Sequence, residues 1–288
     1  MKKILLYIFL PIVAGGMFSS CADYLDVDKY FYDQLSIDSA FSKRKYVDGW
    51  LSNAFEPIQY ITEGEGMRRW MSDDIVKYEG RDYQNGNYSA TTNNGDSEKL
   101  LYKAYEAVRK ASTFIDNVDR CGELTEVEKA DMKGQMRFIR AYAYWSLIRH
   151  FGPVPLIPEH GLDVSLSYEE LSLPRASLDE IVAFIDQDLV VAARSLPMVR
   201  TVNNMGRPTR GAALALRARI LLWVASPLMN GNRDLFNVKD NRGRQLVPQE
   251  YDESKWAKAA AAAKEVMDLG IYELYTIEPS PDTPEYER

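Results

Sequence analysis

Residues 136–151 read MRFIRAYAYWSLIRHF, and this stretch decides the fold class. Apolar and aromatic side chains recur at steps of three and four residues, without proline or glycine, which indicates a helix. Upstream, Thr125 and Glu128 form a capping-box pattern, in which two side chains satisfy free backbone N–H groups at a helix start. Gly152 and Pro153 end the pattern, because proline cannot continue a helix. We therefore predict one long helix from Thr125 to Phe151.

The same signals predict five further helices along the chain. They cover Val47 to Ile58 (ended at Pro57), Asp96 to Val118, Ser177 to Leu196, Thr209 to Ser226, and Glu253 to Leu269. The helix from Thr209 is apolar nearly all round, so we expect it to be buried. The last helix carries an apolar stripe of Trp256, Ala260, Ala263 and Met267, which we expect to face a neighbour.

Successive amphipathic helices separated by loops predict an all-α fold of stacked helical hairpins, similar to tetratricopeptide repeats. No strict 34-residue period is visible, so an irregular helical domain remains an alternative on these residues alone. Two stretches, 59–95 and 227–252, are polar and aperiodic, and we expect them to form long irregular loops. Strand signals are few.

The composition excludes several classes of protein. The chain has 288 residues, 46% of them hydrophobic, which is typical of a globular protein. Its 42 acidic side chains outnumber 35 basic ones, so the net charge of −7 argues against sequence-independent nucleic-acid binding. Two cysteines and two histidines leave few ligands for a zinc site, and we expect no metal or other cofactor.

The first twenty residues, MKKILLYIFLPIVAGGMFSS, have the pattern of a secretory signal peptide. Two lysines precede an apolar run, and small residues lead to Cys21. Ser19, Ser20 and Cys21 resemble the lipobox of bacterial lipoproteins, in which the cysteine is acylated and becomes the first residue. We therefore predict lipidation of Cys21, with a plain signal peptide as the alternative. If Cys21 carries lipid, Cys121 is a free thiol, expected at a helix end as a buried or half-buried residue.

We assign residues 1–20 to the signal peptide, residues 21–35 to a lipidated tether, and residues 36–288 to the helical domain. The tether is acidic and aromatic and has no clear period. The end of the chain, IEPSPDTPEYER, carries no cap or core pattern. We therefore expect the domain to be truncated at its C-terminus.

No motif of an enzyme is present. The sequence lacks a phosphate-binding glycine loop, a G-x-S-x-G elbow and an H-E-x-x-H pair. His150 falls at a predicted helix end and His160 in a loop. The adjacent acids Asp73-Asp74 and Glu169-Glu170 are typical of caps or surface, since paired catalytic carboxylates usually come from different elements. We therefore predict no catalytic residue.

The stretch 65–95 is the best candidate for a ligand site. Aromatic rings stack on the apolar face of a sugar, while amide, carboxylate and guanidinium groups bind its hydroxyls. A protein–protein contact or an ordinary exposed loop would use the same residue types, so both remain alternatives. The candidate ligand-binding residues are Trp70, Asp73, Asp74, Tyr78, Arg81, Tyr83, Asn85 and Tyr88.

Four stretches together resemble the SusD/RagB family of nutrient-binding lipoproteins. Cys21 is followed by an acidic-aromatic start, Asp23-Tyr24-Leu25-Asp26. The strongest signature is R-F-x-R-A-Y-x-Y, ending in G-x-V-P-L. The stretches that match are residues 21–26, 137–157, 206–219, and the helix 256–270 followed by Tyr272, Leu274 and Tyr275.

The resemblance implies an α-helical, tetratricopeptide-like fold in an outer-membrane lipoprotein that faces outward. It implies capture of a glycan, its delivery to a TonB-dependent transporter of the SusC type, and no catalysis. Family members are usually longer, and Lys99-Leu100-Leu101-Tyr102 stands where the family often has a tryptophan. From the family's binding residues we carry over only the loop around Asp73-Asp74. The alternative function is a helical-repeat adaptor on the outer membrane that binds protein and no sugar.

Overall fold

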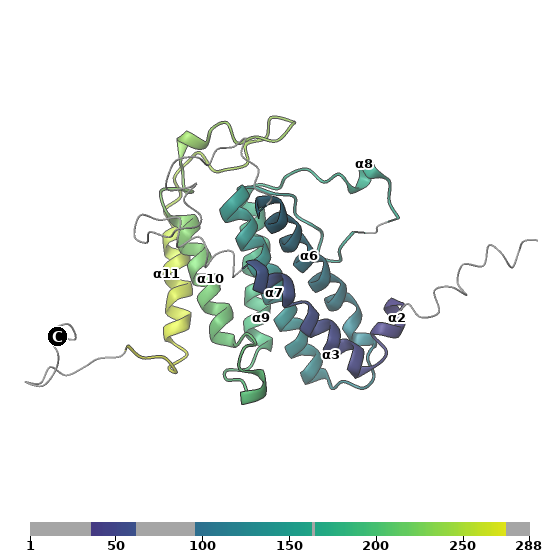
Figure 1. Ribbon diagram of the computed structural model, residues 1–288. Coiled ribbons are helices and arrows are strands. Elements are labelled where there is room, and N and C mark those ends of the chain that lie inside the picture. Colours follow the sequence, from purple (N-terminus) through teal and green to yellow (C-terminus); the bar gives the residue numbers. More distant parts are fainter. Residues whose placement is uncertain (1–35, 62–95, 163–164, 275–288) are drawn as a thin grey trace, which may run out of the picture.

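The computed structural model describes residues 36–61, 96–162 and 165–274 (Figure 1). The predicted signal peptide and tether lie outside the described residues, as do Cys21 and all eight candidate ligand-binding residues. The proposed division of the chain at residues 20 and 35 therefore stays a prediction.

Helices make up the described fold, and most of them agree with the sequence-based boundaries. The long elements are α3 (Arg44–Asn53), α6 (Asp96–Asn117), α7 (Glu126–Phe151), α9 (Leu178–Ser195), α10 (Arg210–Ala225) and α11 (Ser254–Met267). The short ones are α2 (Ile37–Ala40), α8 (Tyr168–Leu171), η3 (Val118–Arg120), η4 (Val202–Asn204) and η5 (Arg233–Leu235).

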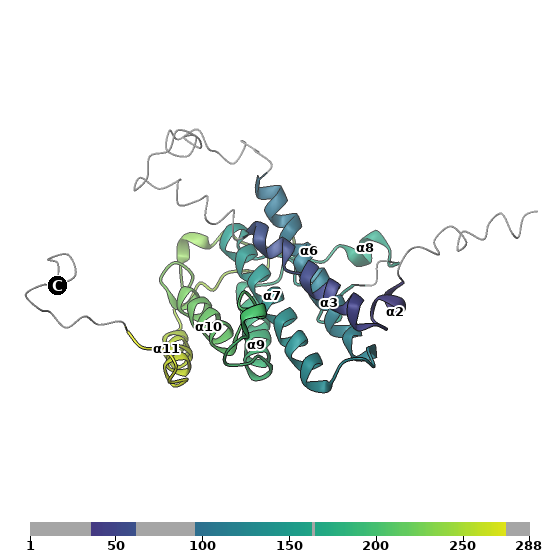
Figure 2. The ribbon, with the colours of Figure 1, turned by 60° about the horizontal axis from the view of Figure 1, so that its bottom comes forward.

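The long helices stack as neighbours in chain order. α7 packs against α6 on one side and α9 on the other, α10 follows α9, and α11 packs on α10 (Figure 2). α3 lies against α6 at the other end of the row. The predicted all-α fold of stacked, tetratricopeptide-like helical hairpins is confirmed.

Small side chains let the helices approach closely. α6 buries Ala104, Ala107 and Ala111 completely. Gly134 of α7 lies where a Cβ atom would be 3.2 Å from Ser195 and Leu196 at the end of α9, so only glycine fits without displacement. Such close contacts remove apolar surface from water, which is the main stabilising contribution in a helical stack.

Aromatic rings fill the wider spaces between the helices. Tyr144 lies edge-on to Phe184, with ring centroids 5.6 Å apart, and joins α7 to α9. Trp145 lies edge-on to Trp223 at 5.2 Å and joins α7 to α10. Edge-to-face geometry suits aromatic rings because the positive edge of one meets the negative face of the other.

The predicted capping boxes are confirmed. Thr125 caps α7 together with Glu128, and Ser177 caps α9 together with Glu180. A third box, which we did not predict, begins α8 at Ser167 and uses Glu170. The expectation that the Glu169-Glu170 pair belongs to a cap or the surface is therefore confirmed.

Three sequence-based expectations were wrong in detail. α3 ends at Asn53, and Pro57 lies in the first turn of a further helical segment, 56–61, where proline needs no N–H partner. α10 is only partly buried, with Leu222 53% exposed.

The expected stripe of α11 points outward, since Trp256 is 39% and Met267 75% exposed. α11 instead buries Ala259 and Ala262, on the helix that contacts α10.

Candidate functional site

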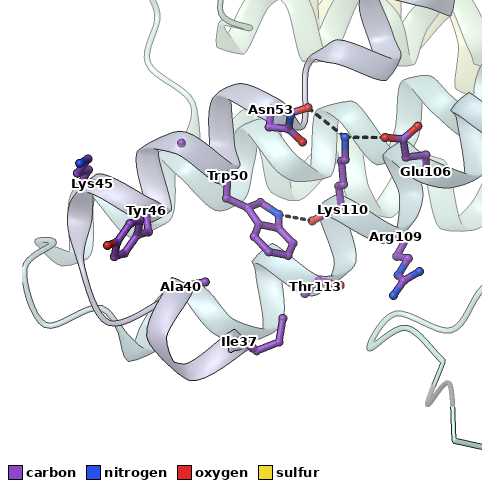
Figure 3. Close-up of a pocket in the computed structure, with 11 residues that line it drawn as sticks. Ile37, Ala40, Lys45, Tyr46, Trp50, Asn53, Glu106, Arg109, Lys110 and Thr113 are labelled. Carbon is purple, nitrogen blue, oxygen red and sulfur yellow. Dashed lines mark hydrogen bonds and ion pairs between the residues drawn. The ribbon is translucent and has the colours of Figure 1, made fainter. Parts of the chain in front are cut away.

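The eight residues predicted to bind ligand lie between the helical segment 56–61 and α6 in the sequence, outside the described residues. α3, which precedes that segment, and α6 pack against each other and border an open groove with α2 (Figure 3). We call this cavity the α3–α6 groove. Its volume is about 630 Å³, and it is lined by Ile37, Ala40, Lys45, Tyr46, Gly49, Trp50, Asn53, Glu106, Arg109, Lys110 and Thr113.

Two aromatic side chains of α3 give the α3–α6 groove its apolar surface. The indole Nε1 of Trp50 donates to the carbonyl oxygen of Lys110 at 3.1 Å. The ring of Trp50 also packs on Phe41, with centroids 5.1 Å apart. Both contacts hold the half-buried indole in place. Tyr46, one turn earlier on α3, is 40% exposed and lies at the groove surface.

Part of the charge in the groove is neutralised internally. The Lys110 ammonium lies 2.7 Å from a carboxylate oxygen of Glu106, and Lys103 lies 3.0 Å from the other oxygen. Burial alone would raise the pKa of Glu106, but hydrogen bonds from Lys110 and Lys103 outweigh it and lower this pKa. Glu106 is therefore held as a carboxylate between two lysines.

Two further cations of the groove differ from Lys110. Lys45 and Arg109 are exposed, and within the described part of the chain neither side chain makes a hydrogen bond or ion pair. Figure 3 shows them at opposite ends of the groove, with Tyr46 and Trp50 between them. An aromatic surface flanked by hydrogen-bond donors suits a ligand with apolar faces and polar edges, such as a sugar chain.

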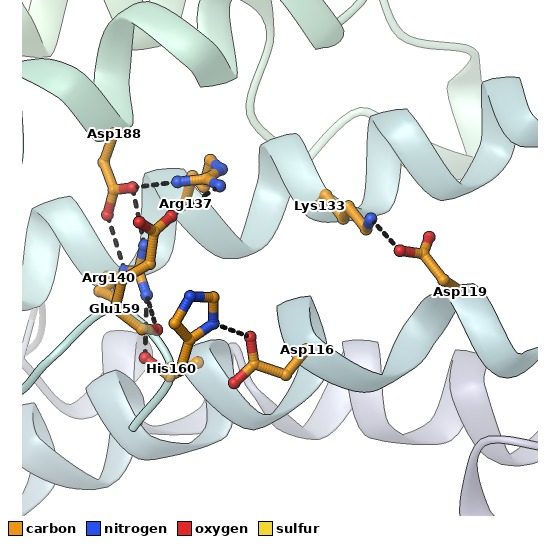
Figure 4. Close-up of polar contacts among 9 residues, drawn as sticks. Asp116, Asp119, Lys133, Arg137, Arg140, Glu159, His160 and Asp188 are labelled. Carbon is orange, nitrogen blue, oxygen red and sulfur yellow. Dashed lines mark hydrogen bonds and ion pairs between the residues drawn. The ribbon is translucent and has the colours of Figure 1, made fainter. Parts of the chain in front are cut away.

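A second polar cluster lies inside the helical stack (Figure 4). Arg140 donates to Asp188 through Nε at 2.7 Å and through Nη2 at 2.8 Å. Its Nη1 donates to Ser112 Oγ at 2.9 Å and to the carbonyl oxygen of Glu159 at 3.0 Å. Arg137 donates to Asp188 at 2.7 Å and to the Glu159 carboxylate at 3.0 Å.

This cluster is a scaffold and leaves little capacity for a ligand. The guanidinium of Arg140 and the carboxylate of Asp188 are buried and use their hydrogen-bonding atoms on each other and on neighbours. The pKa of Arg137 is raised because the attraction of Asp188 and Glu159 outweighs the effect of burial. The two arginines of the R-F-x-R signature thus join α7 to α9 and to the segment that follows α7.

The two histidines and Cys121, which the sequence analysis also considered, make contacts with the surrounding fold. His150 Nδ1 lies 2.6 Å from the Ser146 carbonyl oxygen, and His160 Nδ1 lies 3.0 Å from Asp116 at the surface. Cys121 is a free, fully buried cysteine after η3, which confirms its expected place at a helix end. Among residues 36–61, 96–162 and 165–274, no group of three or more His, Cys, Asp or Glu side chains is placed to hold a metal ion.

Sequence reasoning did not find the α3–α6 groove. Tyr46 and Trp50 lie next to the buried positions Val47 and Leu51 of the α3 stripe. Aromatic residues one position before each buried residue were the available sequence signal for an aromatic surface at the edge of α3. The partner positions lie on α6, about 60 residues further along, so no local pattern connects the two walls.

Comparison with known proteins identifies the family. The family described as SusD-like_3, "Starch-binding associating with outer membrane", matches residues 23–222. A curated relative, SusD-like protein P25 of Formosa agariphila, is 30% identical over 161 residues, which cover 50% of this chain and 30% of that protein.

Solved structures show the same fold. The structure of BT4246 is 26% identical with a TM-score of 0.66, and the match covers 82% of this chain and 42% of that one. A SusD-like protein of Bacteroides fragilis, BF3747, is 23% identical with a TM-score of 0.62, and the match covers 84% and 41%. This chain therefore spans less than half the length of these relatives. Because the family match covers more than half of its sequence, the chain belongs to the SusD-like_3 family.

Proposed function

We propose that this chain is the helical-repeat part of a surface-exposed lipoprotein that captures a glycan and delivers it to a TonB-dependent transporter of the SusC type. The observation that carries the proposal is the family match over residues 23–222, which includes α3, α6, α7 and α9. The α3–α6 groove supports it, because its aromatic and polar lining suits a sugar chain. No catalytic step is part of the proposal.

The proposed anchor is a lipid on Cys21, joined through residues 21–35 to the helical domain of residues 36–288. Acyl chains contribute about 0.8 kcal/mol per buried CH₂ group, so several chains would hold the protein firmly on the outer membrane. In the described part of the chain, no helix is both long and apolar enough to cross a membrane.

The anchor is tested by replacing Cys21 with alanine and measuring how the protein divides between membrane and soluble fractions. We expect C21A to leave the membrane fraction. Cys121→Ala is the matched control, since Cys121 is buried in the fold, and it should stay membrane-bound. Unchanged anchoring of C21A would contradict the lipid anchor.

Glycan capture is proposed to use Trp70, Asp73, Asp74, Tyr78, Arg81, Tyr83, Asn85 and Tyr88 together with the α3–α6 groove. The test is a titration of the purified protein with a panel of neutral and charged polysaccharides, followed by tryptophan fluorescence. We expect Trp70→Phe and the double variant D73N/D74N to weaken binding, and Glu169→Gln on the exposed α8 to leave it unchanged. Absence of binding to every polysaccharide would favour the protein adaptor, and release of sugar from any of them would indicate an enzyme.

The transporter is tested by purifying the lipidated protein from detergent-solubilised native membranes and identifying what co-purifies by mass spectrometry. A TonB-dependent barrel in near-equal amount is the expected result. Recovery of a different protein without any barrel would support the alternative function, a helical-repeat adaptor on the outer membrane.

A further inference from the structure

We propose that the α3–α6 groove binds an anionic glycan, an extended oligosaccharide that carries carboxylate or sulfate groups on more than one sugar unit. This inference rests on the proposed function and narrows it to a class of ligand. It is carried by the charge, the spacing and the rigidity of the residues that line the groove.

The charge of the groove is opposite to that of the whole chain. The chain has a net charge of −7, but the groove is lined by the cations Lys45, Arg109 and Lys110 and by one anion, Glu106. Glu106 is already paired with Lys110 and with Lys103. The charges of Lys45 and Arg109 are therefore uncompensated within the described part of the chain, and a local positive potential attracts anions even on an acidic protein.

The spacing of the cations favours a chain over a single small anion. Lys45 and Arg109 lie at opposite ends of the groove, and the aromatic side chains Tyr46 and Trp50 lie between them (Figure 3). One isolated phosphate or carboxylate would meet only one of the two cations. A sugar chain can place a ring against the aromatic side chains and reach both cations with separate negative groups. The planar guanidinium of Arg109 suits two-pronged binding of a carboxylate or sulfate.

The groove is also preorganised for binding. The bond from the Trp50 indole to the Lys110 carbonyl oxygen and the packing on Phe41 hold the ring in one orientation. A rigid platform reduces the entropy lost when a ligand binds. Arg137 and Arg140 cannot serve in the same way, because the carboxylates of Asp188 and Glu159 already pair with them.

The test compares three oligosaccharides of similar length on the full chain by isothermal titration calorimetry. Oligogalacturonate carries carboxylates, a carrageenan oligosaccharide carries sulfates, and maltoheptaose is neutral. At low salt we expect at least one charged ligand to bind about tenfold more tightly than maltoheptaose, with the difference shrinking as salt is added. Whichever charged ligand binds more tightly at the same salt concentration shows whether the groove prefers carboxylate or sulfate.

Point variants locate the site. Lys45→Gln and Arg109→Gln should each weaken binding of the charged ligand about fivefold and leave maltoheptaose unaffected. Trp50→Phe should weaken all ligands that use the groove. Arg219→Gln is the matched control, since Arg219 is an exposed arginine on α10 outside the groove lining, and it should change nothing.

Each other outcome counts against the inference. Equal affinity for charged and neutral oligosaccharides would overturn it and still support glycan capture. Selective binding that survives both K45Q and R109Q would place the charged ligand elsewhere. If poly-glutamate binds as tightly as the charged sugars, the groove binds anions in general and has no preference for glycans, which would overturn the inference. If the protein binds none of the three oligosaccharides and none of the polysaccharides used to test glycan capture, the proposed function is contradicted as well.

Discussion

Arg140 on α7 and Asp188 on α9 form a buried ion pair with two parallel hydrogen bonds of 2.7 and 2.8 Å. Only 1% of the arginine and 2% of the aspartate is exposed. The pair explains the second arginine of the R-F-x-R signature in structural terms: it connects two neighbouring helices, and the same guanidinium holds the Glu159 carbonyl after α7. The family signature in this chain therefore marks the scaffold.

Asp188→Asn should destabilise the fold strongly. The Asp188 carboxylate pairs with both Arg137 and Arg140, and removing one partner of a buried ion pair typically costs about 3–5 kcal/mol of unfolding free energy. Urea denaturation followed by circular dichroism measures the change. Asp186→Asn on the same helix is the control, because its partly exposed pair with Arg217 should contribute no more than about 1 kcal/mol. Equal losses for D188N and D186N would contradict the scaffold role.

Tyr144→Phe should remove the acceptor for one half-buried backbone N–H group. The Ile157 N–H donates to the Tyr144 hydroxyl at 2.8 Å, and the tyrosine is fully buried. Burial also raises the pKa of Tyr144 above its ordinary value. Leaving the Ile157 N–H unpaired should cost about 1–3 kcal/mol in a denaturation experiment. Tyr102→Phe on α6, where the residue is 76% exposed, should cost nothing measurable, and a similar loss there would refute the explanation.

Two buried serines should respond differently to substitution by alanine. Ser146 Oγ is fully buried and has no hydrogen-bond partner in the described part of the chain, so Ser146→Ala should leave stability unchanged or raise it by up to about 1 kcal/mol. Ser112 Oγ accepts from Arg140, so Ser112→Ala should lower stability by about 1–3 kcal/mol. Thermal unfolding of both variants tests the two predictions, and a loss of stability in S146A would contradict the absence of a hydrogen-bond partner for Ser146.

Stability should fall in acid partly through Glu128. Hydrogen bonds from Thr125 and Arg44 lower the pKa of Glu128 from 4.5 to about 2. Because the folded-state pKa is the lower one, the stabilisation is present above pH 4.5 and is lost as the pH falls toward 2. Glu128→Gln should flatten the decline of unfolding free energy over this range, measured by urea denaturation at several pH values. Thr125→Ala should flatten it partly, and an unchanged slope in E128Q would exclude this carboxylate as a cause.

Most helix boundaries could be predicted because their causes are local. The caps at Thr125 and Ser177 act within three residues, so a short stretch of sequence contains the whole interaction. The predicted helix end at Pro57 was wrong because proline is found both just after the end of a helix and in the first turn of a helix. The preceding chain decides between the two, and here it ends α3 at Asn53.

The candidate site was less accessible to sequence reasoning. The stretch 65–95 was selected by composition, and its residues lie outside the described part of the structure. The α3–α6 groove combines Trp50 with Arg109 and Lys110, which are joined by contacts between helices far apart in the sequence. Such a site has no local pattern, because neither wall is a binding surface without the other.

The sequence by itself determined most of the long helices, the caps at Thr125 and Ser177 and the membership of the family, since these depend on hydrogen bonds and residue patterns within a few turns. Only the tertiary structure decided which face of each helix is buried. α11 has two apolar faces, and its packing on α10 covers Ala259 and Ala262 while Trp256 stays at the surface. The physical reason is that burial depends on the shape of the neighbouring helix, and small alanines permit the closer contact.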